Sequence, residues 1–285
     1  MRRPPLPAEL VEQARSYDAG EARPVEPRDA ATVVLLRDGD TPGQGPEVYL
    51  LRRRTSMAFA GGMCVFPGGG VDRRDFDTTV AWAGPTPDEW ARRLGCEPAM
   101  AQALVCAAVR ETFEESGVLL AGPAAGQVVA DTTGDDWEAD RAALESRALS
   151  LTAFLAARDL VLRSDLLGAW AGWLTPVFEP RRYRTWFFVA RLPEGQVTRD
   201  VSSESSSVTW LPAAEAVAQV EQDRMLMLPP TWLTCLDVAR HDTADAVLKE
   251  AAGRTVEMFT PEVVADGAGF VLSTPAFYAA LLAER

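Results

Sequence analysis

Residues 110–118 of the chain read RETFEESGV. They close a helix that the sequence predicts from about Pro98 to Ser116, because Gly117 is a typical helix-ending residue. Three carboxylates on this helix are spaced at i, i+3 and i+4, which places them on one face, opposite the apolar side chains: Glu111, Glu114 and Glu115. Like charges at these spacings destabilise an exposed helix by roughly a few tenths of a kcal/mol per pair.

A hard divalent cation would offset this repulsion. Mg²⁺ and Mn²⁺ prefer carboxylate and carbonyl oxygens, and they bridge to substrate phosphates. A solvated acidic surface is the alternative explanation of the same three glutamates. The helix therefore predicts either a cation site or an exposed acidic face, and the residues around it in the sequence have to distinguish the two.

The composition excludes several other kinds of site. The chain has 285 residues, of which 47% are hydrophobic, and a formal net charge of -13. This apolar content suffices for a sizeable core, and the charge argues against binding nucleic acid or an anionic membrane by bulk electrostatics. Lys249 is the only lysine and His241 the only histidine, which excludes a P-loop or Schiff-base lysine and a paired-histidine metal site.

Cysteine usage and hydropathy predict a cytoplasmic protein. The four cysteines show no C-x-x-C spacing, and we expect them to be reduced or buried. The Pro- and Arg-rich start of the chain has no apolar region after it, and no stretch approaches the roughly 20 apolar residues of a membrane span.

The pattern along the chain predicts three parts: a lead-in at residues 1–28, a domain at 29–228, and a C-terminal extension at 229–285 that packs on the same domain. Within the domain, residues 76–98 form an insertion, with a small helix that begins at the capping box of residues 86–89. Runs rich in β-branched and aromatic residues predict strands near residues 31–36, 47–51, 62–66, 173–177, 186–192 and 208–211. Helical periodicity predicts helices over residues 136–170, 213–220, 231–240 and 243–252.

Two further features accompany the glutamate helix. The stretch Phe66-Pro67-Gly68-Gly69 precedes it, and Glu204 stands six residues before Trp210. Together with RExxEExGV at residues 110–118, they resemble the Nudix hydrolase family, whose box reads G-x5-E-x7-R-E-U-x-E-E-x-G-U, with U a bulky apolar residue. Thr112 occupies the first U position, which is a mild departure.

The spacing of the box is the larger departure. Arg110 follows Gly69 by 41 residues instead of the family's 14, so about 27 residues interrupt the box. The position six residues after Gly69 is Asp75 instead of a glutamate, so the loop carboxylate is either Asp75 or a residue of the insertion. A Nudix branch that includes the peroxisomal CoA diphosphatases carries an insertion here. The chain resembles that branch over about residues 28–230, also in WxTP at 173–176 and RYxTxFF at 182–188.

The resemblance implies an α/β/α sandwich with a mixed sheet, extended by the helical insertion and the helical C-terminal segment. It implies that the three glutamates hold Mg²⁺ or Mn²⁺, with the Gly68 carbonyl as a further ligand, and that Arg110 orients a carboxylate. Glu204 would assist the base or bind another cation; its alternative is an ordinary polar residue in a serine-rich loop. The implied reaction is attack of a metal-activated water on a diphosphate phosphorus.

Arginines are the expected phosphate ligands in so acidic a chain, because a guanidinium pairs with two phosphate oxygens at once. Arg52, Arg53 and Arg54 follow one predicted strand, and Arg182 and Tyr183 open another. Of these residues, Arg52, Arg54, Arg182 and Tyr183 are the candidate substrate ligands. CoA or acyl-CoA is the favoured substrate, with ADP-ribose, NADH and nucleotide sugars as alternatives. A Nudix-fold sensor that binds a metabolite without hydrolysing it is a further alternative. We expect no nucleic-acid or membrane partner, and a homodimer through residues 229–285 stays open.

Overall fold

A mixed β-sheet forms the centre of the molecule. The computed structural model of the chain describes residues 6, 8–41, 43–57, 60–267 and 269–283. The strands of the sheet run in the order β10-β2-β1-β9-β8-β11, with β3 paired to β2 and β4 paired to β1. β1 pairs with β9, and β8 with β11, in parallel, and the other pairs are antiparallel. The bounds are β1 Arg28–Asp38, β2 Pro46–Arg53, β3 Cys64–Val65, β4 Gly68–Gly70, β8 Leu167–Leu174, β9 Tyr183–Arg191, β10 Ser205–Pro212 and β11 Met258–Phe259.

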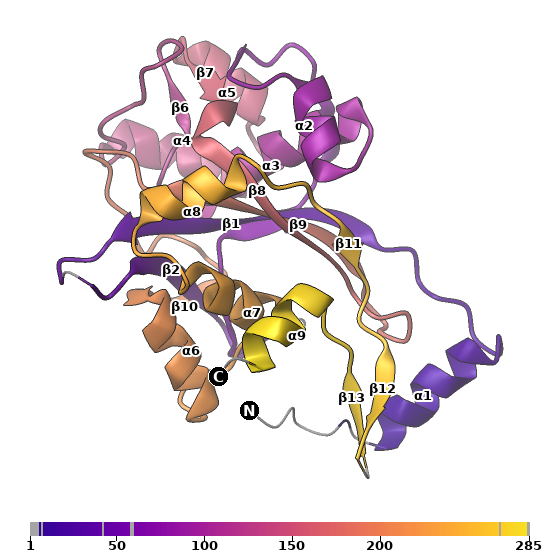
Figure 1. The fold of residues 1–285 in the computed structure, drawn as a ribbon. Helices are drawn as coiled ribbons and strands as arrows, with labels where there is room; N and C mark the ends of the chain where they lie inside the picture. The colour runs from indigo at the N-terminus through magenta and orange to yellow at the C-terminus, as the bar shows by residue number, and fades with distance from the viewer. Residues whose placement is uncertain (1–5, 7, 42, 58–59, 268, 284–285) are drawn as a thin grey trace.

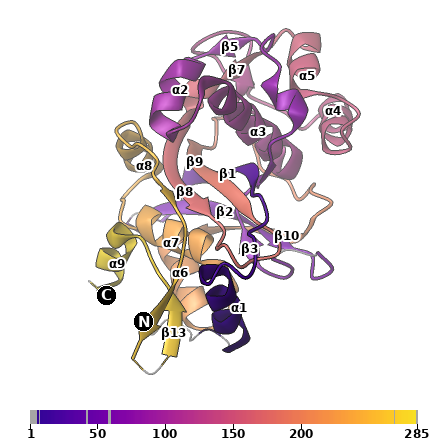
Figure 2. The same cartoon turned by 90° about the vertical axis from the view of Figure 1, so that its right-hand side faces the viewer.

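Helices cover both faces of this sheet (Figure 1; Figure 2). Side chains alternate along β1, so Val33 and Leu35 join a core with α3 (Pro98–Ser116), whereas Val34 and Leu36 join a second core with α7 (Pro229–Val238). The first core also takes side chains from α2 (Pro87–Leu94), α4 (Asp135–Glu145) and α5 (Leu151–Ala157). The second takes them from α6 (Ala213–Glu221), α8 (Ala244–Ala251) and α9 (Ala276–Ala283). The predicted α/β/α sandwich with a mixed sheet is confirmed.

Helix α3 is buried on almost every side. It begins with Pro98 in the first turn and ends at Gly117, which adopts the left-handed conformation with φ 74°, as predicted. Its acidic face is covered by β4 and by the 3-10 helix η1 (Arg73–Phe76), and Glu114 and Glu115 are only 7% and 8% exposed. The alternative of a solvated acidic surface is therefore wrong.

The insertion folds over the β9 side of the face that carries α3. It contains β5 (Trp82–Ala83) and α2 (Pro87–Leu94), and α2 begins at the predicted capping box. Trp90 of α2 packs edge-on against Phe188 of β9, with ring centroids 5.7 Å apart. Across the same contact, Trp186 Nε1 donates to the Leu94 carbonyl at 2.9 Å. These aromatic contacts anchor the insertion to the central sheet.

The helix predicted over residues 136–170 is wrong in its second half. The structure has α4 (Asp135–Glu145) and α5 (Leu151–Ala157), and then the chain turns at Asp159, whose φ is 53°. Residues 161–163 form β7, the middle strand of a small sheet with β5 and β6 (Ala121–Gly122), and η2 (Ser164–Leu166) leads into β8. Pairing with strands distant in the sequence prevails here over the helical spacing of the leucines.

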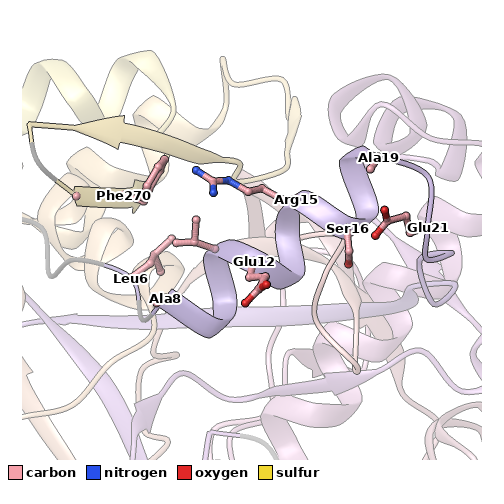
Figure 3. Close-up of a pocket in the computed structure, with 10 residues that line it drawn as sticks. Leu6, Ala8, Glu12, Arg15, Ser16, Ala19, Glu21 and Phe270 are labelled. Carbon is pink, nitrogen blue, oxygen red and sulfur yellow. The ribbon is translucent and has the colours of Figure 1, made fainter.

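The N-terminal helix lies beside a hairpin from the C-terminal part of the chain, away from the central sheet. Helix α1 (Ala8–Asp18) packs beside the hairpin of β12 (Val263–Asp266) and β13 (Gly269–Leu272). The Leu6 amide donates to the Phe270 carbonyl at 2.7 Å, and the Arg15 guanidinium lies over the Phe270 ring (Figure 3). An open cleft follows this contact along α1. Within the described ranges, no helix combines the length and apolarity needed to cross a membrane.

Candidate active site

The three glutamates of α3 lie over the short strand β4. The β1–β4 register pairs Ala31 with Gly69 and Thr32 with Gly68. A Cβ on Gly69 would collide with the Glu111 carboxylate, so only glycine leaves room for that side chain. Glu115 Oε2 accepts a hydrogen bond from the Gly68 amide at 2.8 Å. The two glycines therefore bring the strand backbone into direct contact with the acidic face of the helix.

The backbone of Gly68 faces the glutamates and not β1. The Val33 amide donates to the Pro67 carbonyl and the Val71 amide to the Asp29 carbonyl, so Gly68 occupies a non-hydrogen-bonded position of this antiparallel pair. At such a position the amide and the carbonyl of a residue both point away from the partner strand. The Gly68 carbonyl thus points to the same side as its amide, which already binds Glu115.

Arg110 connects the glutamates to the loop before the insertion. Its Nη1 donates to Glu111 Oε1 at 2.7 Å and to both oxygens of Glu114 at 3.3 Å. Its Nε and Nη2 bind the Asp75 carboxylate in a bidentate pair at 3.1 and 3.0 Å, and Nη2 also reaches the Gly70 carbonyl at 3.1 Å. Asp75, which lies six residues after Gly69, therefore supplies the carboxylate that pairs with Arg110, and the extra residues follow it.

The local charge is strongly negative. Three buried or nearly buried carboxylates contact the guanidinium of Arg110, those of Asp75, Glu111 and Glu114, and the buried Glu115 carboxylate lies next to them on the same helix. Burial, followed by the charge of Glu111, raises the pKa of Glu114 to about 7 and that of Glu115 well above its usual value. Burial also raises the pKa of Glu111. Without a further positive charge, the cluster holds protons that exposed glutamates would release.

The carboxylates do not form a preorganised metal-binding site in this arrangement. Across the described part of the chain, no three His, Cys, Asp or Glu side chains are grouped so that they could hold a metal ion. Arg110 attracts Glu111 and Glu114, while the Gly68 amide holds Glu115. The donor chemistry nevertheless fits a hard divalent cation, because carboxylates and a carbonyl oxygen meet at a site of excess negative charge.

Glu204 lies at the open side of this cluster. Its side chain is 50% exposed and pairs with Arg53 at 2.9 Å, and its carbonyl accepts from the Arg54 amide at 3.0 Å. The charge of Glu204 contributes to the raised pKa of Glu111 and Glu115, which places it in their electrostatic neighbourhood. Its segment leads directly into β10.

Known proteins with similar sequences identify the family. The family model of the NUDT19 Nudix domain matches residues 88–240, more than half of the chain. The chain belongs to the Nudix hydrolase family. Putative nudix hydrolase 7 of Caenorhabditis elegans is 27% identical over 208 residues, which cover 71% of this chain and 57% of that protein. Acyl-coenzyme A diphosphatase NUDT19 of Xenopus laevis is 26% identical over 222 residues, with coverages of 65% and 58%. The chain thus spans less than two thirds of the length of these two relatives.

A solved structure shares the fold. The NUDIX hydrolase from Alicyclobacillus acidocaldarius superposes with a TM-score of 0.66 at 24% identity, and the match covers 82% of this chain and 99% of that one. The Nudix arrangement of sheet and helices therefore extends over most of the present chain.

The structure brings only some of the predicted substrate ligands to the Nudix helix. Alternation along β2 places Arg53 on the same face as Leu51, which packs with α3, and Arg52 on the opposite face. Arg53 Nε is buried and has no hydrogen-bond partner among the described residues. Arg54 Nε donates to the Ser205 carbonyl at 3.0 Å, next to Glu204. Strand alternation was the signal that could have singled out Arg53 in advance.

Arg182 and Tyr183 lie elsewhere. Arg182 is 8% exposed and donates to the carbonyls of Thr175 and Val25 at 3.1 and 3.0 Å, so its guanidinium holds the chain before β9 in place. Tyr183 lies four residues before Phe187 in β9, so strand alternation places both on the same face, the one opposite α3.

Proposed function

We propose that this protein is a Mg²⁺- or Mn²⁺-dependent diphosphatase that hydrolyses CoA or acyl-CoA to 3′,5′-ADP and (acyl-)4′-phosphopantetheine. The observation that carries this proposal is the meeting of three glutamates of the Nudix helix with the Gly68 backbone, where Arg110 alone opposes their charge in the contacts described above. The choice of substrate rests on the insertion in the Nudix box and on the name of the Xenopus relative, acyl-coenzyme A diphosphatase.

Glu111, Glu114, Glu115 and the Gly68 carbonyl would hold the cation. Bound there, a divalent cation lowers the pKa of a water ligand and neutralises charge on the diphosphate oxygens. The contacts of Arg110 with Asp75 and the Gly70 carbonyl keep its guanidinium at the back of the cluster. The Gly68 amide fixes one oxygen of Glu115 and leaves the other to face a ligand.

Glu204 is our candidate for the residue that accepts the proton of the attacking water. The water oxygen forms a bond to phosphorus as the bond to the bridging oxygen breaks, and the leaving phosphate keeps that electron pair. The exposure of Glu204 lets it reach a bound substrate, and its ion pair with Arg53 holds it in place. Among the arginines we assign phosphate binding to Arg53 and Arg54, because both lie beside Glu204.

Other diphosphates remain as second candidates. ADP-ribose, NADH and nucleotide sugars carry the same phosphoanhydride bond, and the site contacts described here do not discriminate between the groups attached to it. A metabolite sensor without hydrolysis would have no need to keep three mutually repelling carboxylates in a buried cluster.

Product analysis tests the proposal. CoA is incubated with Mg²⁺ and either the wild type or Glu115→Gln, with ADP-ribose, NADH and a nucleotide sugar in parallel. We expect 3′,5′-ADP and 4′-phosphopantetheine from the wild type, and turnover at least about 100-fold lower for the variant, since it removes a carboxylate ligand. Cleavage of another diphosphate alone would contradict the CoA assignment. Equal turnover of wild type and variant would contradict the metal-site assignment.

A further inference from the structure

Helix α4 is joined to the end of the Nudix helix by a buried arginine. Arg141 is 4% exposed, and its Nη1 donates to the Glu114 carbonyl at 2.6 Å. That carbonyl belongs to the last turn of α3, where carbonyls lack partners within the helix and a cation is favoured. On the same side, Trp137 of α4 packs edge-on against Phe113 of α3, with ring centroids 6.4 Å apart. Helix α4 is thus fixed to α3 at the turn that carries Glu114 and Glu115.

Two carboxylates of α4 flank Arg141 and extend toward another part of the chain. Glu138 binds Arg141 Nε at 2.9 and 3.0 Å, and Glu145 binds Nη1 at 3.0 Å. The other contact of Glu138 is with Arg199 Nη1 at 2.7 Å, and Glu145 Oε1 accepts from the Ser203 amide at 2.9 Å. Both acceptors therefore connect α4 to the segment of residues 199–203.

This segment ends at the carboxylate that faces the site. Glu204 follows Ser203 directly, and its carbonyl and side chain are held from the other side by Arg54 and Arg53. At the beginning of the segment, the Arg199 amide donates to the Ser116 carbonyl at 2.9 Å, and Tyr49 donates through its hydroxyl to the Arg199 carbonyl at 3.0 Å. Of these contacts between the segment and the side of the molecule that carries α3, the hydrogen bond from the Ser203 amide to Glu145 is the nearest to Glu204 along the chain.

We infer that Glu145 is a positioning residue, which Arg141 orients and which holds Glu204 at a set distance from the glutamates of the Nudix helix. The inference rests on the proposed function, since it gives Glu204 a role in turnover. Glu145 itself does not contact the substrate. It acts through the Ser203 amide, because a hydrogen bond to the preceding residue restricts where the Glu204 backbone can lie. A misplacement of about 1 Å at a reacting group is enough to lower a rate by about 100-fold.

The test is a double-mutant cycle between Glu145→Ala and Glu204→Gln. Alanine keeps the helix propensity of α4 while removing the contacts of the carboxylate with Arg141 and Ser203. We expect Glu145→Ala to lower kcat by about 10- to 100-fold with KM changed by less than about twofold. In the Glu204→Gln background the same substitution should change kcat by less than about twofold, because residues that act through one another are not additive. Equal losses in both backgrounds would overturn the inference.

Asp140→Ala is the matched control. Asp140 lies on the same helix and pairs with Arg158 at 2.6 Å, away from residues 199–203. We expect this variant to keep the kcat of the wild type. If it loses as much as Glu145→Ala, the effect is a general loosening of α4, and the inference is overturned.

Hydrogen exchange of the metal-free protein provides a readout that does not depend on turnover. Glu145→Ala should accelerate exchange at least about threefold in a peptide covering residues 199–206, with α3 unchanged, and Asp140→Ala should leave both unchanged. Unchanged exchange of residues 199–206 in Glu145→Ala would overturn the inference whatever the activity. A wild-type protein that cleaves none of the four diphosphates would instead contradict the proposed function.

Discussion

Arg110 determines the charge balance of the site at the scale of single residues. Its guanidinium contacts Asp75, Glu111 and Glu114, whereas Glu115 is held by the Gly68 amide. Burial lowers the pKa of Arg110, but the charges of Glu111, Asp75 and Glu114 raise it by more, so Arg110 remains charged. Burial, together with the repulsion between the carboxylates, raises the pKa values of the three glutamates.

The stability of the metal-free protein should therefore fall as the pH rises. The pKa of Glu114 is raised from 4.5 to about 7, so between these values the folded state binds more protons than the unfolded state. The free energy of unfolding then decreases as the pH rises across this window, by roughly a few kcal/mol in total. Urea unfolding in EDTA at pH 5 and at pH 7.5 measures the difference.

Glu114→Gln should reduce that difference, because the amide does not titrate. Glu97→Gln serves as the control, since Glu97 is an exposed glutamate just before the same helix. We expect the control to keep the pH dependence of the wild type. A pH dependence that Glu114→Gln leaves intact would show that its source lies outside the cluster.

At the scale of elements, a strand of three glycines meets a helix of closely spaced carboxylates. No residue other than glycine fits at position 69, because a Cβ there would meet the Glu111 carboxylate. Gly70, the next residue of β4, is different: the nearest atom to its Cβ would be the Asp29 carbonyl oxygen at 3.9 Å. A substitution at Gly69 therefore disturbs the contact with the glutamates, whereas the same substitution at Gly70 changes only the strand itself.

Gly69→Ala should lower turnover at least about tenfold, because Glu111 has to turn away from the position that it occupies over β4. The clash involves the end of a flexible side chain, so we expect the free energy of unfolding to change by less than about 1 kcal/mol. Gly70→Ala should leave both quantities unchanged. Steady-state kinetics and urea unfolding of the two variants measure the effects, and equal turnover in both would refute the contact.

At the scale of the whole molecule, residues 229–285 complete the second core. Leu233 and Leu236 of α7, Val247 of α8 and Tyr278 of α9 pack against the same side of the sheet as Val34. The segment also adds β11 to the free edge of β8. We propose that residues 29–228 and this extension fold together and do not form independent parts.

Truncation after Met227 should abolish folding, because it exposes the apolar face of the sheet that α7, α8 and α9 cover. Truncation after Leu272 removes only α9 and should lower Tm without loss of the native near-ultraviolet circular dichroism. Light scattering and circular dichroism on both truncated proteins and on the whole chain measure these outcomes. Light scattering of the whole chain also tests for a homodimer. A folded and monodisperse fragment ending at Met227 would contradict the shared core.

Features that depend on residues close together in the chain could be predicted from the amino-acid sequence. The bounds of α3, its three glutamates and its end at Gly117 follow from helical periodicity and from the freedom of glycine at a left-handed position. The position of Asp75 six residues after Gly69 was likewise readable. Its role was not, because Arg110 lies 35 positions further along the chain, and the segment between them had to fold before Asp75 could meet Arg110.

Which segments meet depended on the folded chain. The structure showed that the acidic face of α3 is buried and that residues 161–163 pair as a strand. It also joined Glu145 to Ser203, which lie 58 residues apart. The physical reason is that burial, strand pairing and ion pairs depend on contacts between distant segments, whereas propensity and periodicity act only within a few residues along the chain.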